Sequence, residues 1–142
     1  MLGIISNIIA GMVMSIQGVM NTRLNEKIGL FEANAFVQCT AFIASLIVML
    51  IFGKGNLKTI TTIPWYYLLG GLLGVVITVT VMLGIGKTSP TVAISIILIS
   101  QLITAALIDG FGIMGSEKIG FKWNNYVGAI LMIAGVIIFK NF

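Results

Sequence analysis

Residues 65–111 read WYYLLGGLLGVVITVTVMLGIGKTSPTVAISIILISQLITAALIDGF. Within this stretch two apolar runs, Trp65–Ile85 and Thr91–Phe111, are separated by a short polar segment. A helix crosses the hydrocarbon core of a bilayer with roughly 17–25 apolar residues, and both runs have that length. Ser89 and Pro90 match an N-cap followed by a proline in the first helical turn, so the second run begins a new helix. The stretch therefore predicts two consecutive membrane-spanning helices.

The rest of the chain has the same apolar character. Hydrophobic residues make up 58% of the 142 residues and charged residues 8%, whereas a soluble domain carries roughly 25% charged residues. Three further runs have the length of a span: Leu2–Thr22, Ala33–Phe52 and Trp123–Phe139, the last being the shortest. The first run lacks a basic start and a convincing cleavage site, so we expect a retained span and not a signal peptide. We therefore expect an all-α integral membrane protein with one domain of five transmembrane helices over residues 1–142.

The eight Lys and Arg residues lie at the ends of the predicted spans. Because consecutive connections face opposite sides, four of these charges fall on each side of the membrane. One side receives Lys54, Lys58, Lys118 and Lys122, and the other receives Arg23, Lys27, Lys87 and Lys140. A membrane protein usually fixes its orientation by an excess of Lys and Arg on the cytoplasmic side. The even count predicts a dual-topology protein that inserts both ways and pairs with an inverted copy of itself as an antiparallel homodimer.

The composition also argues against several classes of function. The chain has no histidine and a single cysteine, Cys39, so we expect neither an intrachain disulfide nor a metal site of the usual His/Cys kind. No nucleophile–base pair is evident, so we expect neither an enzyme nor a cofactor. The basic residues stand at span ends and do not form a patch, so nucleic acid is not an expected partner.

Amide side chains form polar stripes on three of the predicted helices. Gln17 and Asn21 share a face of the first helix, Gln38 lies on the second, and Gln101 and Asp109 lie on the fourth. An unpaired amide in hydrocarbon costs several kcal/mol, so these faces must turn inward or towards water. Hydrogen bonds that only hold the bundle together, worth about 0.6–2 kcal/mol each, are the alternative for any single amide. Because three stripes converge, we expect Gln17, Asn21, Gln38 and Gln101 to line a cavity near the midplane, and we expect Asp109 to be a further substrate-binding residue.

Asp109 is the only acidic residue within a predicted span. Intramembrane carboxylates mark ion or proton pathways by default. Asp109 also lies within a few residues of the end of its span, so a partly solvated carboxylate at a helix end is the competing explanation.

Small residues at a spacing of four form a ridge on the third predicted helix. Gly70, Gly74 and Thr78 lie on one helix face, where they allow a neighbouring helix to approach closely. We interpret this ridge as a packing surface.

Four segments resemble the YdcZ-type family of the drug/metabolite transporter superfamily. They are QGVMNTRL at residues 17–24, PWYYLLGGLLG at 64–74, Gln101-Leu102 followed by LIDGFG at 107–112, and GAILMIAGV at 128–136. Ser100 stands where that family often has glycine, and Gly110 where it often has histidine, so a His-assisted proton step is not implied. The resemblance implies a five-helix unit that occurs as dual-topology singles, as pairs of opposite orientation or as ten-helix fusions. The even charge count selects the first form.

Together these observations predict a multi-pass protein of the inner (plasma) membrane. We expect secondary active transport of a small polar or charged solute by alternating access, performed by the inverted homodimer in the lipid bilayer. A passive channel for ions or small solutes and a non-transporting accessory subunit of a membrane complex are the alternatives.

Overall fold

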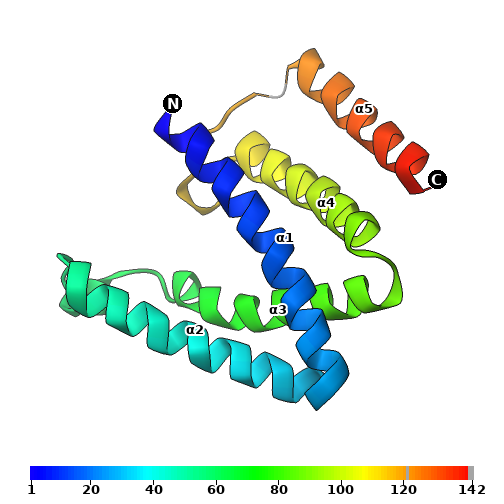
Figure 1. The fold of residues 1–142 in the computed structure, drawn as a ribbon. Coiled ribbons are helices and arrows are strands. Elements are labelled where there is room, and N and C mark those ends of the chain that lie inside the picture. The colour runs from blue at the N-terminus through cyan, green and yellow to red at the C-terminus, as the bar shows by residue number, and fades with distance from the viewer. Residues whose placement is uncertain (121, 141–142) are drawn as a thin grey trace. The chain divides into compact units, whose positions relative to one another are not determined.

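The computed structural model describes residues 1–120 and 122–140, and all of its regular elements are helices (Figure 1). The α-helices are α1 (Leu2–Ile28), α2 (Leu30–Phe52), α3 (Gly70–Lys87), α4 (Pro90–Phe111) and α5 (Trp123–Lys140). Three short 3₁₀ helices lie in the connections: η1 (Leu57–Thr62), η2 (Trp65–Leu69) and η3 (Ile113–Gly115). The all-helical prediction is confirmed for the described residues.

Four segments in the described part of the chain are long and apolar enough to cross a membrane. They are Leu2–Ile28, Leu30–Phe52, Trp65–Lys87 and Pro90–Phe111, and the apolar part of α5, Trp123–Phe139, is shorter. The largest difference from the predicted bounds is at α1, which continues beyond Thr22 to Ile28. It continues because residues 23–28 contain neither glycine nor proline, so the helix runs on past the apolar span until Gly29.

The contacts of the chain divide into two compact units, residues 1–87 and the chain from Thr88 onward. The first unit contains α1, α2 and α3, and the second contains α4 and α5. The single five-helix domain stays a prediction. Each unit is described separately below.

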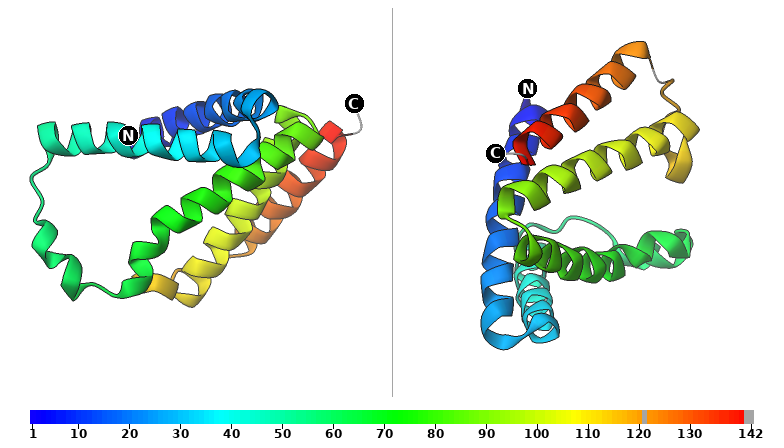
Figure 2. Two further views of the ribbon diagram at one scale, coloured as in Figure 1. Left: turned by 90° about the horizontal axis from the view of Figure 1, so that it is seen from below. Right: turned by 90° about the vertical axis from the view of Figure 1, so that its right-hand side faces the viewer.

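A one-residue corner at Gly29 joins α1 to α2 (Figures 1 and 2). The glycine has a φ of 100°, which side-chain-bearing residues rarely adopt. Its N–H donates to the carbonyl oxygen of Asn25 at 3.0 Å, and its own carbonyl accepts from the N–H of Ala33 at 3.0 Å. The end of one helix and the start of the next are thus both capped by this residue.

The core of the first unit lies where α1 crosses α3. Gly18 and Thr22 are buried on α1, and Met82 and Ile85 are buried on α3. A Cβ placed on Gly18 would come within 2.9 Å of Ile85 Cδ1, so the two helices meet at the glycine. The Thr22 hydroxyl donates to the Gly18 carbonyl at 2.8 Å, which satisfies it inside its own helix.

The second unit is a helical hairpin of α4 and α5, which lie side by side (Figures 1 and 2). The predicted N-cap of α4 is confirmed, because the Ser89 hydroxyl accepts from the N–H of Val92 at 3.3 Å and Pro90 follows it. At the other end α4 stops at Gly112, whose φ of 65° is left-handed. The loop then returns to α4, where the N–H of Ile119 donates to the Asp109 carbonyl at 2.9 Å.

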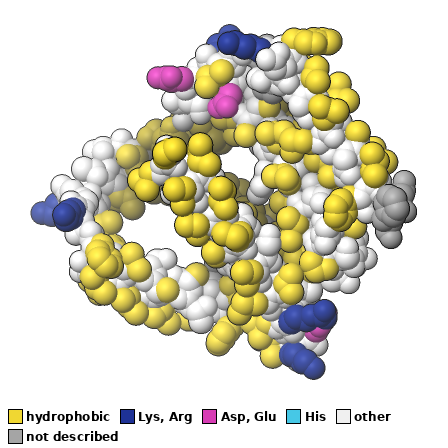
Figure 3. All heavy atoms as spheres, turned by 45° about the horizontal axis from the view of Figure 1, so that its top comes forward, with side chains coloured by type: hydrophobic (Ala, Val, Ile, Leu, Met, Phe, Trp, Pro, Cys, Tyr) yellow, Lys and Arg dark blue, Asp and Glu magenta, His cyan; other side chains and the backbone are white. Residues whose placement is uncertain are grey.

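Apolar side chains cover much of the outer surface of the helices (Figure 3). Leu50 and Phe52 on α2, for example, expose 73% and 72% of their surface. Charged side chains occur in small groups, such as the exposed ion pair of Arg23 with Glu26, whose N–O distance is 3.0 Å. Such a surface is unfavourable in water and suited to hydrocarbon.

Candidate functional site

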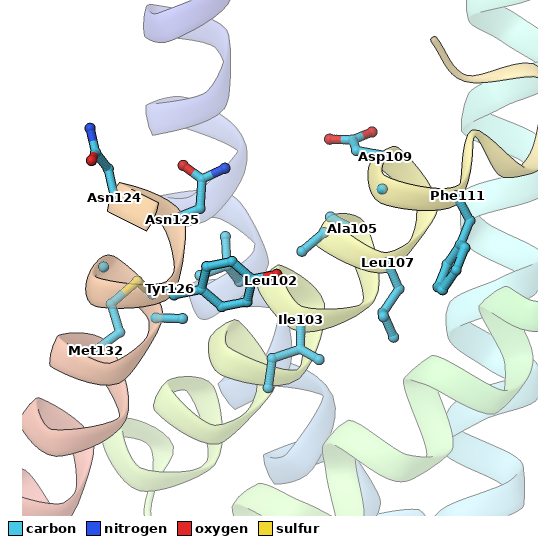
Figure 4. Close-up of a pocket in the computed structure, with 14 residues that line it drawn as sticks. Leu102, Ile103, Ala105, Leu107, Asp109, Phe111, Asn124, Asn125, Tyr126 and Met132 are labelled. Carbon is cyan, nitrogen blue, oxygen red and sulfur yellow. The ribbon is translucent and has the colours of Figure 1, made fainter. Parts of the chain in front are cut away.

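A cleft with a volume of about 850 Å³ lies between α4 and α5 (Figure 4). All its lining residues come from these two helices, so the site is built within the second unit. From α4 it takes Leu102, Ile103, Ala105, Ala106, Leu107, Asp109, Gly110 and Phe111, and from α5 it takes Asn124, Asn125, Tyr126, Gly128, Ala129 and Met132.

The polar side chains gather at one end of the cleft. Asp109 lies near the last turn of α4, and Asn124, Asn125 and Tyr126 lie in the first turn of α5. Because α4 and α5 pack side by side as an antiparallel hairpin, the end of α4 and the start of α5 meet at the same level (Figure 1). Figure 4 shows the carboxylate of Asp109 and the amide of Asn125 at this shared end, on opposite walls of the cleft.

The remainder of the cleft is apolar. Leu102, Ile103 and Met132 supply bulky walls. Ala105 on α4 and Gly128 on α5 are small residues of the lining, and they leave space that larger side chains would fill. The site thus combines a long apolar body with one polar end, as small-molecule sites commonly do.

Asp109 provides the negative charge of the cleft. The residue is partly exposed, and it is the only acidic residue among those that line the cleft. An ionised carboxylate only accepts hydrogen bonds, so it can hold a cation or exchange a proton at this position. The arrangement is therefore suited to binding a positively charged group.

Gln101 is on the same helix but does not line the cleft. It is exposed and lies eight residues before Asp109, which is about 12 Å along a helix axis. The neighbouring hydroxyl of Thr104 donates to the Ser100 carbonyl at 2.8 Å, so it is satisfied within α4. The structure does not bring Gln101 and Asp109 into one cavity, and a substrate contact of Gln101 stays a prediction.

The predicted residues of α1 stand beside its packing face. Gln17 is exposed and Asn21 is partly exposed, whereas their neighbours Gly18 and Thr22 are buried. The α1 amides are therefore available to a ligand or another surface and take no part in the core of their own unit.

Gln38 has a different environment, because it reaches across to the glycine ridge of α3. Its Nε2 atom donates to Thr78 Oγ1 at 3.4 Å, and a Cβ placed on Gly74 would lie 3.8 Å from the same nitrogen. One turn earlier on α2, Asn34 is 8% exposed, and its Oδ1 is buried without a hydrogen-bond partner in the described residues. Asn34 and Gln38 thus lie on the side of α2 that is partly or fully buried, and Gln38 joins α2 to α3. A substrate contact of Gln38 stays a prediction.

The sequence interpretation missed the amides at the start of α5. Asn124 and Asn125 stand between Trp123 and Tyr126 at the start of the fifth apolar run, and no polar stripe in that run marks them as site residues. The signal that could have found them is the order of the chain, since consecutive helices are usually neighbours and the end of α4 then lies near the first turn of α5.

Among residues 1–120 and 122–140 no group of three or more His, Cys, Asp or Glu side chains could hold a metal ion. Cys39 is a free, exposed cysteine.

Comparison with known proteins identifies the family. The sequence model of a family described as "Putative inner membrane exporter, YdcZ" matches residues 2–138. The chain matches no curated protein and no solved structure. The match spans nearly the whole chain, in agreement with the resemblance of the four segments described above, and its description agrees with the long apolar helices. The chain therefore belongs to the YdcZ family and is a multi-pass protein of the inner membrane with a transporter-like function.

Proposed function

We propose that the protein is a secondary active exporter of a small polar or charged solute, working by alternating access as an inverted homodimer. The observation that carries the proposal is the α4–α5 cleft, where the Asp109 carboxylate stands at one end of an apolar site. An intramembrane carboxylate beside a ligand-sized space is the arrangement expected of an ion-coupled transporter. Membership of an exporter family supports the same reading.

The inverted partner is supported by the placement of charge. Five spans put the two termini on opposite sides of the membrane, so an inverted second copy supplies the opposite orientation at every position. Four Lys or Arg residues fall on each side, and they leave no electrostatic preference between the two insertions. Both orientations would then be present for pairing.

An inverted pair also explains alternating access without an ATPase motif. When the two protomers exchange conformations, the outward-open and inward-open states are related by symmetry and have equal intrinsic energy. Gradients of the solute and of a coupling ion then set the direction of flux. In this scheme Asp109 holds the charged ligand or the coupling ion, while Gln17, Asn21, Gln38 and Gln101 contribute hydrogen bonds along the path.

Counterflow in proteoliposomes tests the proposal. Vesicles loaded with a library of metabolites and cations should accumulate a labelled member of that library against its gradient, at no more than about 10³ turnovers per second. Asp109→Asn should abolish this exchange. Glu117→Gln is the matched control, because Glu117 is a carboxylate of the following loop and does not line the cleft.

Two results would favour the alternatives. Electrical currents far above the turnover of a carrier would indicate a passive channel in the same inverted pair. The protein would instead be an accessory subunit if it shows no flux and can be isolated only as part of a larger complex.

A further inference from the structure

We propose that the ligand of the α4–α5 cleft is an organic cation: an ammonium group bound at Asp109, carrying an apolar body that lies against the walls formed by Leu102 and Met132. This inference rests on the transport function proposed above and names the chemical class of its solute.

The charge of the cleft selects a cation. Asp109 lines it, and none of the residues that the structure places around the cleft is a Lys or Arg. Asp109 is partly exposed at the polar end of the cleft, and a ligand of opposite charge is attracted to its carboxylate. An anionic ligand would meet the same carboxylate with like charge and would be repelled.

The neighbouring polar groups suit an ammonium group. The side-chain oxygen of Asn125 can accept a hydrogen bond at the end of the cleft that Asp109 occupies (Figure 4). The ring of Tyr126 lines the same cleft, and aromatic rings attract organic cations through their faces. A carboxylate, an amide and an aromatic ring together recognise an N–H-bearing cation better than any neutral ligand.

A bare metal ion fits this site poorly. Hard cations such as Ca²⁺ require about six to eight oxygen ligands, and the cleft offers fewer, from one carboxylate and the amide oxygens of Asn124 and Asn125. The greater part of its surface is hydrocarbon, which contributes nothing to a small ion. The same surface contributes to the affinity of a ligand with an apolar body.

The dimensions set the size of that body. Asp109 and Leu102 are seven residues apart on α4, or about 10 Å along the axis. An aromatic ring on a two-carbon linker reaches this far, and the volume of about 850 Å³ accommodates it. The small residues Ala105 and Gly128 of the lining leave space for the ring.

Cysteine protection in native membranes tests the assignment without requiring transport. The reporter is Ala105→Cys in a Cys39→Ala background, labelled with N-ethylmaleimide. The probe is phenethylamine, a cation at neutral pH, and its matched controls are the neutral 2-phenylethanol, the anionic phenylacetate and methylamine, which lacks the apolar body. At ten times its dissociation constant the probe should slow labelling about tenfold.

The control variants separate charge recognition from folding. Asp109→Glu keeps the charge and should keep the protection, whereas Asp109→Asn should remove it. A second reporter, Ile113→Cys, lies in the loop after α4 and outside the cleft, so its labelling should not respond to any probe.

Three results would overturn the assignment: equal protection by 2-phenylethanol or phenylacetate, protection that survives Asp109→Asn, or no protection by phenethylamine. If any of these occurs while another solute still shows Asp109-dependent counterflow, the export function stands and only the ligand class is wrong. Failure of both measurements would remove the function as well.

Discussion

Gln38 on α2 and Thr78 on α3 are joined through their side chains. The amide Nε2 of Gln38 donates to Thr78 Oγ1 at 3.4 Å, and the Thr78 hydroxyl in turn donates to the Gly74 carbonyl at 2.9 Å. A Cβ placed on Gly74 would lie 3.8 Å from the same amide nitrogen, at ordinary van der Waals distance. A ridge that the sequence marks as a packing surface therefore also carries a hydrogen bond between helices.

We expect a small but measurable coupling between these two residues. Gln38→Leu, Thr78→Val and the double variant should give a coupling free energy of about 0.6 kcal/mol and no more than about 1.7, the range of hydrogen bonds between membrane helices. Unfolding in mixed micelles with increasing SDS measures it. Strict additivity would mean that the hydrogen bond contributes nothing and that Gln38 is retained for another reason.

Gly18 should tolerate substitution far less well than Gly11. At Gly18 a Cβ would lie 2.9 Å from Ile85 Cδ1 and 3.3 Å from Val81 Cγ1, whereas a Cβ at Gly11 meets nothing within 4 Å. Alanine favours a helix by about 1 kcal/mol over glycine, so Gly11→Ala should be neutral or stabilising. Gly18→Ala should not show this stabilisation, because its Cβ would crowd Ile85. Gly18→Leu should separate α1 from α3. Equal unfolding midpoints for Gly11→Leu and Gly18→Leu would contradict the packing of these helices.

Gln101→Leu tests whether the Gln101 amide binds the solute or only forms hydrogen bonds that hold the helices together. Leucine suits the bilayer and removes only the hydrogen-bonding group, so the protein should keep its fold and the proposed dimer while solute binding is lost. Size-exclusion chromatography checks the assembly, and counterflow checks the binding. Normal counterflow would contradict a substrate contact of Gln101.

The sequence predicts the helices better than it predicts the site. Length and apolarity alone locate the spans, and Ser89 and Pro90 mark the start of α4, because these signals are local. Asp109 stands out for the same reason, as a charge within an apolar run. The sequence does not single out Asn125 and Tyr126, because they come near Asp109 only when α5 folds back on α4. Gln38 shows a further limit, since one amide pattern fits both a ligand contact and the helix-to-helix bond that the structure contains.

The orientation of the wild-type chain is the most direct test of the inverted homodimer. Two reporters, one active only in the cytoplasm and one only in the periplasm, should be fused in turn after Phe142 and compared at equal expression. With four basic residues on each side, both should be active to a comparable degree, and two lysines added at the C-terminus should shift the population towards the cytoplasmic reporter. A wild-type chain that activates only one of the two reporters would contradict the inverted pair.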